Sequence, residues 1–368
     1  MAVSATSLQV ITRFVPLPEA LAALDGIQPV AACSILVADS SGHILASDIL
    51  APETMPQRPQ ALYDGIALSA EATLDASMFS PVLLTNPVRL VSGAAVPDGA
   101  DALVAGNVVQ FRGDFAEITA PATSGDGILA VGGNCEAGAV LRRAGSRVRP
   151  SDAAVFTLAG ITGVNVRAPK VCIGCARESV ILRAAADMLA QELQLEKTSS
   201  YVMSLEDALR DQNADAVVSI GGTGEGRNDG SMLALRKAGR IIFHGLGLTP
   251  GETAAFGFIG EKPVLLMPGR LDATVAVWRI LGKKLMARLC GSSDEVEMTS
   301  TATLMRKVIS TIGMAEFIPL RIEAGKAEPL AAKYLSMSVL ADANAWMLVP
   351  PASEGYQAGA SVTVQPWR

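Results

Sequence analysis

The 368-residue chain is poor in several residue types, and each shortage narrows the functions open to it. It has two histidines, His43 and His244, so a multi-histidine metal centre cannot be built from it. Charged residues make up 18% and apolar residues 50%, against ~25% charged in average proteins, which excludes a disordered chain. The formal net charge of -6 disfavours general nucleic-acid binding, because that function needs a positive surplus.

Long hydrophobic runs are also missing, although the mean hydropathy is +0.35. The most apolar stretch, residues 276–289, is interrupted by arginine and lysine, so no membrane span is expected. The first residues contain no charged segment followed by a long apolar one, which argues against a signal peptide. We therefore expect a soluble, cytoplasmic protein. Its low charge leaves little polar surface, which predicts a large subunit interface and a homodimer.

The five cysteines are an odd number and lie far apart in a chain large enough to need no staples, so structural disulfides are not expected. Cys172 and Cys175 form a C-x-x-C pair, which elsewhere serves redox or zinc chemistry. Both fall within an expected buried strand, and no second pair stands at metal-binding spacing. We favour a structural role for the two thiols.

The chain length predicts two or three domains, and the sequence pattern changes along it. Residues 15–25 predict a short helix that Gly26 stops, and short β-rich runs separated by turns predict a small β-domain over 44–142. A helix follows over 151–160, with Ser151 as its N-cap and Gly160 as its stop.

After Pro169 the expected strands and helices alternate, which predicts a parallel sheet covered by helices on both faces. From about residue 294 the period returns to two, which indicates a closing β-domain. The expected strands of the α/β part are 170–175, 215–220, 240–248 and 262–267, and its helices are 179–194, 204–213, 229–239 and 271–290.

The segment most indicative of function is residues 215–230, where a strand is followed by Gly221, Gly222, Gly224 and Gly226. Glycines before a helix leave backbone N–H groups uncovered and allow positive φ, so the loop can hold a phosphate. The alternative is a turn that needs glycine only for tight packing. The spacing does not meet G-x-G-x-x-G, so a nicotinamide dinucleotide fold is not indicated. Asp229 can be a helix cap or a metal or ligand contact, and the sequence alone favours the cap.

Three other polar segments leave alternatives open. Arg58, Asp64 and Gly65 lie in residues 55–70, where Asp-Gly most often marks a turn, and Ser92 lies in an expected loop. Residues 142–149 contain Arg142, Arg143, Arg147 and Arg149, either as a solvated basic loop or as an anion site. His244 is expected to be a hydrogen-bonded loop histidine and not a base.

Taken in order, these segments resemble the MoeA family, the molybdopterin molybdenumtransferases that include the E domain of gephyrin, along nearly the whole chain. PQALYDGIALSA is similar to S-A-M-D-G-Y-A and VSGAAVPDGADALV to T-G-A-x-x-P-x-G-A-D-A-V, with Ser92 where threonine is usual. GGTGEGRND is similar to G-G-V-S-x-G-x-x-D, which places the family's binding acid on Asp229. FHGLGLTPGETAAFG resembles F-x-x-V-x-x-K-P-G-K-P-x-x-F-G, and LLMPGRLDA resembles L-P-G-N-P-V-S.

The resemblance implies an α/β plus β fold, with a central three-layer molybdopterin-binding domain between small β-domains. The implied parts are 1–43 with 143–168 (helices and linker), 44–142, 169–293 and 294–368. It also implies a homodimer in which the partner subunit completes the active cleft. The implied activity is binding of adenylylated molybdopterin, cleavage of the adenylate with Mg²⁺ or another divalent cation, and insertion of molybdate. No membrane or nucleic-acid partner is implied.

Residue by residue, the resemblance assigns catalysis to Asp64, Asp229 and Glu178, and metal binding to Asp64 and Asp229. The cofactor-binding residues that it implies are Gly221, Gly222, Thr223, Gly224, Gly226, Ser92, Pro250, Gly251, Pro268 and Gly269.

Several positions depart from the family pattern. Thr249 and Glu252 stand where two lysines surround the P-G, which removes positive charge beside an oxyanion site. Arg270, Leu271 and Ala273 replace Asn, Pro and Ser, G-D-E has become A-R-E-S at 176–179, and G-E-D has become Gly145, Ser146 and Arg147. A second hypothesis is therefore a non-catalytic molybdopterin carrier, chaperone or regulator, and a third is a scaffold without a ligand.

Overall fold

The computed structural model describes residues 9–227, 229–293 and 299–367. Backbone packing divides the chain into two compact units. Unit 1 comprises residues 1–47, 144–150 and 163–368, and unit 2 comprises 48–143 and 151–162. The finer division into four parts that the resemblance implies stays a prediction.

A six-stranded sheet forms the centre of unit 1, in the order β16-β15-β17-β21-β20-β18. The first four strands are parallel, but β20 pairs antiparallel with β21 on one side and with β18 on the other, so β20 runs against the other five and the expectation of an all-parallel sheet is wrong. Gly260, at φ +59°, lies in the tight turn between β20 and β21, and so short a connection can join only antiparallel strands. The strands are β15 (Lys170–Cys175), β16 (Ser199–Ser204), β17 (Ala216–Ile220), β18 (Arg240–His244), β20 (Ala255–Ile259) and β21 (Lys262–Met267).

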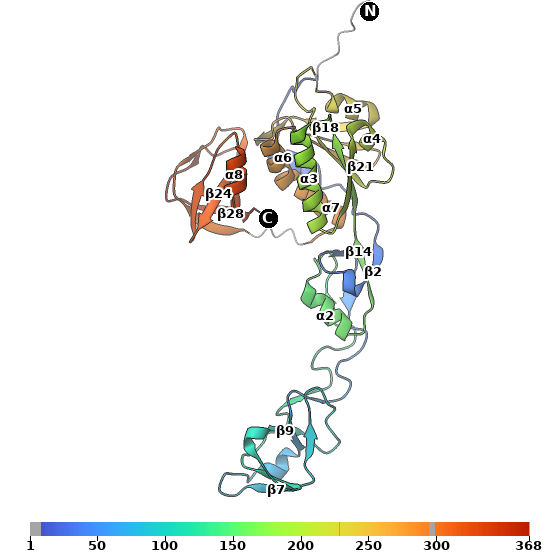
Figure 1. Ribbon diagram of the computed structural model, residues 1–368, viewed down its shortest axis with the longest axis vertical. Helices are drawn as coiled ribbons and strands as arrows, with labels where there is room; N and C mark the ends of the chain where they lie inside the picture. The colour runs from blue at the N-terminus through green and yellow to red at the C-terminus, as the bar shows by residue number, and fades with distance from the viewer. Residues whose placement is uncertain (1–8, 228, 294–298, 368) are drawn as a thin grey trace, which may run out of the picture. The chain divides into compact units, whose positions relative to one another are not determined.

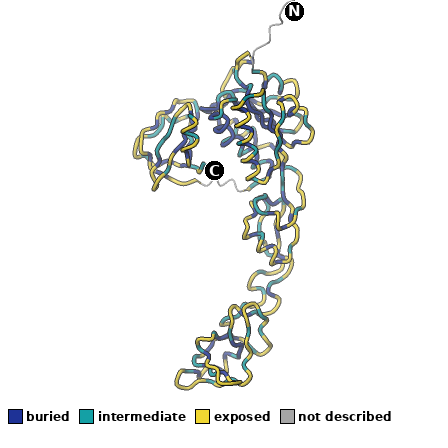
Figure 2. The backbone as a smooth tube through the Cα atoms, in the orientation of Figure 1, coloured by how far each residue is buried: buried dark blue, intermediate teal, exposed yellow. Residues whose placement is uncertain are grey.

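Helices cover both faces of this sheet, as the alternating pattern predicts (Figure 1). On one face α3, α6 and α7 pack over side chains such as Ile173 and Val218, and on the other α4 and α5 pack over Cys172 and Val217. The inner strands β15, β17, β20 and β21 are buried, whereas the edge strands β16 and β18 are largely exposed or half-buried (Figure 2). Gly291 ends α7 at φ +60°, as expected. The helices are α1 (Leu17–Ala22), α3 (Val180–Leu195), α4 (Leu205–Arg210), α5 (Ser231–Ala238), α6 (Leu271–Val277), a π-helical turn η4 (Trp278–Gly282) and α7 (Lys283–Cys290).

The C-terminal part of unit 1 is a small β-barrel, since β26 pairs both with β28 and back with β24. Its interior is apolar, which agrees with the expected period-two pattern. Its elements are β22 (Ser300–Leu304), β23 (Val308–Ile309), β24 (Ala315–Glu323), β25 (Lys326–Pro329), α8 (Met337–Asp342), β26 (Ala345–Val349), β27 (Gly355–Tyr356) and β28 (Ser361–Pro366). The short strands β1 (Val15–Pro16) and β19 (Leu246–Thr249) extend the sheet, and β2 (Cys33–Leu36), β3 (Ile44–Leu45) and β14 (Gly163–Arg167) form another.

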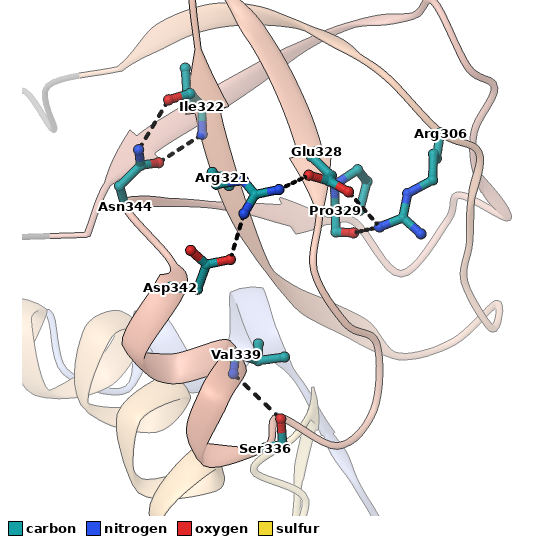
Figure 3. Close-up of polar contacts among 9 residues, drawn as sticks. All are labelled: Arg306, Arg321, Ile322, Glu328, Pro329, Ser336, Val339, Asp342 and Asn344. Atoms are coloured by element: carbon teal, nitrogen blue, oxygen red, sulfur yellow. Dashed lines mark hydrogen bonds and ion pairs between the residues drawn. The ribbon is translucent and has the colours of Figure 1, made fainter.

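Polar contacts tie α8 to the outside of the barrel (Figure 3). Arg321 bridges Glu328 and Asp342, the latter at 3.0 Å, and Arg306 reaches Glu328 at 3.3 Å. The Oγ of Ser336 accepts a hydrogen bond from Val339 N and caps the helix. The Arg321 and Asp342 side chains are exposed, so water and salt screen these ion pairs and we expect them to contribute little to stability.

Unit 2 is built from short strands, as the β-rich pattern predicts. Its helix α2 (Pro150–Leu158) begins at the proline, so the expectation that Ser151 is its N-cap is wrong. Proline is favoured at the first helical position because its φ is fixed and it lacks the N–H. Gly160 follows the helix at φ +74°. The strands are β4 (Ile49–Leu50), β5 (Gln60–Ala61), β6 (Gly65–Leu68), β7 (Val82–Thr85), β8 (Val88–Leu90), β9 (Ala102–Ala105), β10 (Val109–Arg112), β11 (Phe115–Ile118), β12 (Ile128–Leu129) and β13 (Val140–Arg142).

The sequence predicts no membrane-spanning helix, and the lengths and apolar character of the observed helices test this. None of those in the described ranges combines the length and the apolar character needed to cross a bilayer.

Candidate functional site

The strand order of the six-stranded sheet reverses at β15, which has β16 on one side and β17 on the other. Ligands bind open α/β sheets at such a point, outside the carboxyl ends of the strands. A cavity of about 1030 Å³ lies there, lined from the ends of β15 and β16 and from the first turns of α3, α4 and α5. The candidate site is therefore this cavity together with the glycine loop that follows β17.

Glu178 lines this cavity, where the resemblance expects an acid. Two arginines that the sequence did not single out, Arg177 and Arg183, line it as well. Arg183 Nε lies 3.1 Å from Asp187 Oδ1, four residues along the exposed side of α3. The pattern that could have revealed them is their spacing around the start of α3, which places Ser179 and Arg183 on one side of the helix.

The glycine loop, residues 221–226, requires its first two glycines for both backbone and space. Gly221 and Gly222 have φ of +89° and +70°, and a Cβ on Gly222 would lie 2.3 Å from Ser231 Oγ. Ser231 Oγ in turn donates to Gly221 O at 2.7 Å. Gly269, after β21, approaches Gly221 so closely that its Cβ would lie 3.2 Å from Gly221 Cα. The glycines are therefore needed for tight packing, which was the alternative to phosphate binding. Whether the loop can also bind an anion depends on its backbone N–H groups.

The carbonyl oxygens of the loop are bonded by side chains from other segments. Gln9 Nε2 donates to Gly222 O at 2.8 Å and to Gly224 O, and His244 Nε2 lies 2.9 Å from Thr223 O. His244 is therefore a hydrogen-bonded loop residue, as expected. Gln9 was missed, because it lies 213 residues from Gly222 and belongs to no motif.

The N–H groups of residues 222–225 behave differently from the carbonyls. They make no hydrogen bond to any residue within the described ranges. The Oγ1 of Thr223 lies 2.8 Å from Thr253 Oγ1, so the Thr223 hydroxyl is paired with a side chain outside the loop. The loop therefore offers donors and withholds acceptors, the polarity that an anion requires.

Asp229 does not cap α5, so the expectation of a cap is wrong. The N-cap is Gly230, and no side chain bonds there. Instead the chain turns back, Asp229 N donating to Gly226 O at 3.0 Å, and Asp229 Oδ2 accepts from Gly226 N at 3.0 Å. A Cβ on Gly224 would lie 2.7 Å from this oxygen. The carboxylate thus lies directly against the glycine loop.

The turn after β19 contains Pro250, in a cis peptide bond with Thr249, and Gly251 at φ +139°. Gly251 N donates to Glu252 Oε2 at 3.0 Å. A carboxylate therefore already accepts the hydrogen bond that this N–H group would otherwise donate to an oxyanion. Negative charge is therefore present at the position where the family pattern has lysine.

Arg270 is the cation that replaces asparagine after Pro268 and Gly269. Its Nη2 lies 2.6 Å from Oδ2 of Asp272, which is 3% exposed. The hydrogen bond to Asp272 raises the pKa of the Arg270 guanidinium, and the charge of Glu252 raises it further. Arg270 is thus paired with Asp272, although Glu252 lies near enough to affect the pKa of the guanidinium.

Asp64 and Ser92 meet in unit 2. Ser92 N donates to Asp64 Oδ1 at 2.7 Å, and Ser92 Oγ donates to Leu62 O at 3.1 Å. Gly65 is required by space, because its Cβ would lie 2.5 Å from Val104 O. The structure brings these two predicted residues together in unit 2, while the others lie in unit 1.

Two arginines of the basic segment make contacts inside the protein. Arg142 Nε lies 3.4 Å from Oδ2 of the buried Asp152, and Arg147 Nη1 donates to Gly42 O at 2.7 Å. These contacts favour a structural role for Arg142 and Arg147 over an anion site.

The C-x-x-C thiols lie on opposite faces of the sheet. Cys172 packs in the core beneath α4 and α5, and Cys175 packs against the core beneath α3. Burial raises the pKa of both, that of Cys172 to about 12. Among the described residues, no three His, Cys, Asp or Glu side chains lie close enough to hold a metal by themselves.

This burial predicts the order of thiol alkylation. Iodoacetamide at pH 8 should modify the exposed Cys33 first and leave Cys172 and the buried Cys290 unmodified until the protein unfolds, because only accessible thiolate reacts. Mass spectrometry of peptides after timed quenching measures this order. Rapid labelling of Cys172 in the folded protein would contradict it.

Comparisons with known proteins agree with this architecture. The model of the MoeA N-terminal region (domain I and II) matches residues 15–160, that of a "probable molybdopterin binding domain" matches 184–288, and that of the MoeA C-terminal region (domain IV) matches 301–367. The chain belongs to the MoeA family, and its role falls in molybdenum cofactor biosynthesis.

Relatives cover almost the full length. A molybdopterin molybdenumtransferase of Staphylococcus aureus is 24% identical over 90% of each chain, and that of Bacillus subtilis is 23% identical over 90% of this chain and 88% of its own. The crystal structure of the molybdopterin biosynthesis MoeA protein from Pyrococcus horikoshii superposes with a TM-score of 0.81, at 23% identity, over 96% of this chain and 100% of its own. The fold is therefore the multidomain MoeA fold.

Proposed function

We propose that this chain binds adenylylated molybdopterin at the carboxyl edge of its α/β sheet and inserts molybdate into it. The observation that carries the proposal is the glycine loop beside the cavity: the N–H groups of residues 222–225 make no hydrogen bond to the described residues, whereas the carbonyls of residues 222–224 are bonded. The cavity, of about 1030 Å³, reaches the upper end of the usual size range for small-molecule sites and can admit a pterin nucleotide. Arg177 and Arg183 add positive charge for its phosphates.

Asp229 explains why a divalent cation fits this site. A carboxylate lying against an anion-binding loop repels a phosphate unless a cation stands between them. Mg²⁺ needs only one or two carboxylates when substrate phosphates and water supply its remaining ligands. Asp229 Oδ1 makes no hydrogen bond to the described residues, so Asp229 would hold Mg²⁺. Bound there, the ion would neutralise phosphate charge.

The remaining parts of the proposal concern the assembly. We propose a cytoplasmic homodimer in which the partner supplies Asp64 and Ser92 to complete the cleft, with Asp64 as a further cation ligand. The Asp64 and Ser92 pair is already ordered within unit 2 by the 2.7 Å bond from Ser92 N, which supports a shared role.

Titration tests the proposal directly. Purified protein is mixed with adenylylated molybdopterin, Mg²⁺ and molybdate, and adenylate release and metal-loaded cofactor are measured. Both products should appear and should depend on Mg²⁺. Absence of binding would reject the proposal, and binding without either product would reject insertion alone.

Binding without insertion is the second candidate function, that of a molybdopterin carrier, chaperone or regulator. Glu252 favours it, because its carboxylate holds the Gly251 amide and would repel molybdate. The same titration separates the two candidates.

The loop geometry gives a variant with a large effect on binding. Gly222→Ala should weaken molybdopterin binding at least about tenfold, because the new methyl group must displace Ser231 and the residue must keep a φ of +70°. Gly113→Ala is the matched control, since Gly113 has φ +61° but open space around it. Equal binding by the two variants would contradict the proposed role of the loop.

A further inference from the structure

The N-terminal segment enters the fold at the glycine loop. Gln9 is 3% exposed, and its side chain makes three hydrogen bonds there. Its Nε2 donates to the carbonyls of Gly222 and Gly224, and its Oε1 accepts from Met232 N at 3.2 Å, in the first turn of α5. One side chain thus joins the loop to the helix that follows it.

These bonds fix the direction of backbone groups that Gln9 does not touch. In a trans peptide the C=O of one residue and the N–H of the next point in opposite directions across a rigid plane. Gln9 holds the carbonyls of Gly222 and Gly224, so the N–H groups of Thr223 and Glu225 must point away from it. His244 holds the carbonyl between them, which fixes the N–H of Gly224.

We propose that Gln9 is a positioning residue, which sets the N–H groups of Thr223 and Glu225 for a phosphate group of the bound ligand. This inference rests on the proposed function and adds to it a residue outside the α/β domain. Gln9 does not touch the ligand in this scheme. It acts through the peptide planes, so its loss should weaken recognition of the phosphate and leave recognition of the pterin unchanged.

The segment that carries Gln9 is anchored well enough to do this. Ile11 N donates to Glu225 Oε1 at 2.6 Å, and Val15 N donates to Gly245 O at 3.0 Å, where β1 joins β19. Gly245 allows the close approach, because a Cβ there would lie 2.6 Å from Ile11 Cγ2. Gln9 is therefore held from the chain behind it as well as by the loop.

The chemistry of the side chain explains why it is glutamine. Two carbonyl oxygens need donors and Met232 N needs an acceptor, and a primary amide supplies both at one position. Glutamate offers only acceptors when ionised, so it would repel the two carbonyls. Methionine has similar length and volume but cannot make strong hydrogen bonds.

The test compares Gln9→Met and Gln9→Glu with the unaltered protein, using molybdopterin and its dephosphorylated form as probes. Gln28→Ala is the matched control, since the exposed Gln28 side chain makes a local bond to Gly26 O at 3.2 Å and no other bond to the described residues. We expect both Gln9 variants to bind molybdopterin at least about tenfold more weakly, a change of about 1.4 kcal/mol, and to bind the dephosphorylated form as the unaltered protein does. Gln28→Ala should bind both probes normally.

Each other outcome has a separate meaning. Normal molybdopterin binding by Gln9→Met, or an equal loss for both probes, would overturn the positioning role. Failure of the unaltered protein to bind molybdopterin in either its free or its adenylylated form would instead overturn the proposed function. If a Gln9 variant unfolds at a lower temperature than the unaltered protein, hydrogen exchange of the unaltered protein is the test. The amides of residues 223–225 must then exchange more slowly with molybdopterin bound and not with its dephosphorylated form.

Discussion

Replacing Glu252 by lysine is expected to raise the affinity of the protein–molybdopterin complex for molybdate by about a hundredfold. Two unit charges ~4 Å apart interact by about 4 kcal/mol at an effective dielectric of ~20, and the half-buried position of Glu252 screens part of this. The change removes a repelling carboxylate, releases Gly251 N, which now donates to Glu252 Oε2 at 3.0 Å, and adds a cation. Molybdate binding is measured by equilibrium dialysis with saturating molybdopterin.

The control for this prediction is Glu261→Lys, which makes the same change of charge elsewhere. Glu261 is exposed in the turn before β21, while Pro268 and Gly269 follow the other end of that strand. It should leave molybdate affinity unchanged at moderate ionic strength, because exposed charges beyond ~10 Å are screened. An increase for Glu261→Lys as large as that for Glu252→Lys would show a general charge effect and contradict the local explanation.

The sequence predicts those features of the fold that local patterns determine. The buried strand Lys170–Cys175 and the helix Val180–Leu195 follow from apolar periodicity, and Gly291 ends its helix because glycine adopts positive φ freely. The reversed strand β20 was not predicted, since it lies in a segment rich in Gly and Ala. Parallel and antiparallel strands read alike when both faces are buried.

In the candidate site too, features set by neighbouring residues could be predicted, and contacts between distant segments could not. The glycine loop and Glu178 were found because their residues stand next to strand and helix ends. The cap assigned to Asp229 was wrong because a turn back to Gly226 competes with capping, and both use the same residue type. Gln9 could not be found, because a bond spanning 213 residues leaves no trace in local spacing.

Breaking the buried ion pair between α3 and the π-helical turn should have the largest effect on stability. Glu192 Oε1 lies 2.7 Å from Arg279 Nη2 and its Oε2 lies 2.8 Å from Lys283 Nζ, with the Arg279 side chain 8% exposed. Glu192→Met removes the carboxylate and leaves the buried Arg279 charge without this partner. We therefore expect the free energy of unfolding to fall by about 3 kcal/mol. Denaturation followed by tryptophan fluorescence measures it, since all three tryptophans lie in unit 1.

The control lies in the same helix. Asp187→Asn removes an ion pair whose side chains are 71% and 51% exposed, and it should change the free energy of unfolding by less than about 0.5 kcal/mol. If the two variants lose equal stability, burial of the Glu192 pair is not what stabilises it.

Acid provides an independent test of the same carboxylate. Burial raises the pKa of Glu192, but the hydrogen bond from Lys283 and the charges of Lys283 and Arg279 outweigh burial and hold it below the ordinary 4.5. A group whose pKa is lower in the folded state binds fewer protons there, so its stabilisation is complete above pH 4.5 and is lost as pH falls through the folded-state pKa. The free energy of unfolding should therefore fall with acid more steeply in the unaltered protein than in Glu192→Met. Parallel pH profiles for the two proteins would show that Glu192 does not stabilise the fold through its charge.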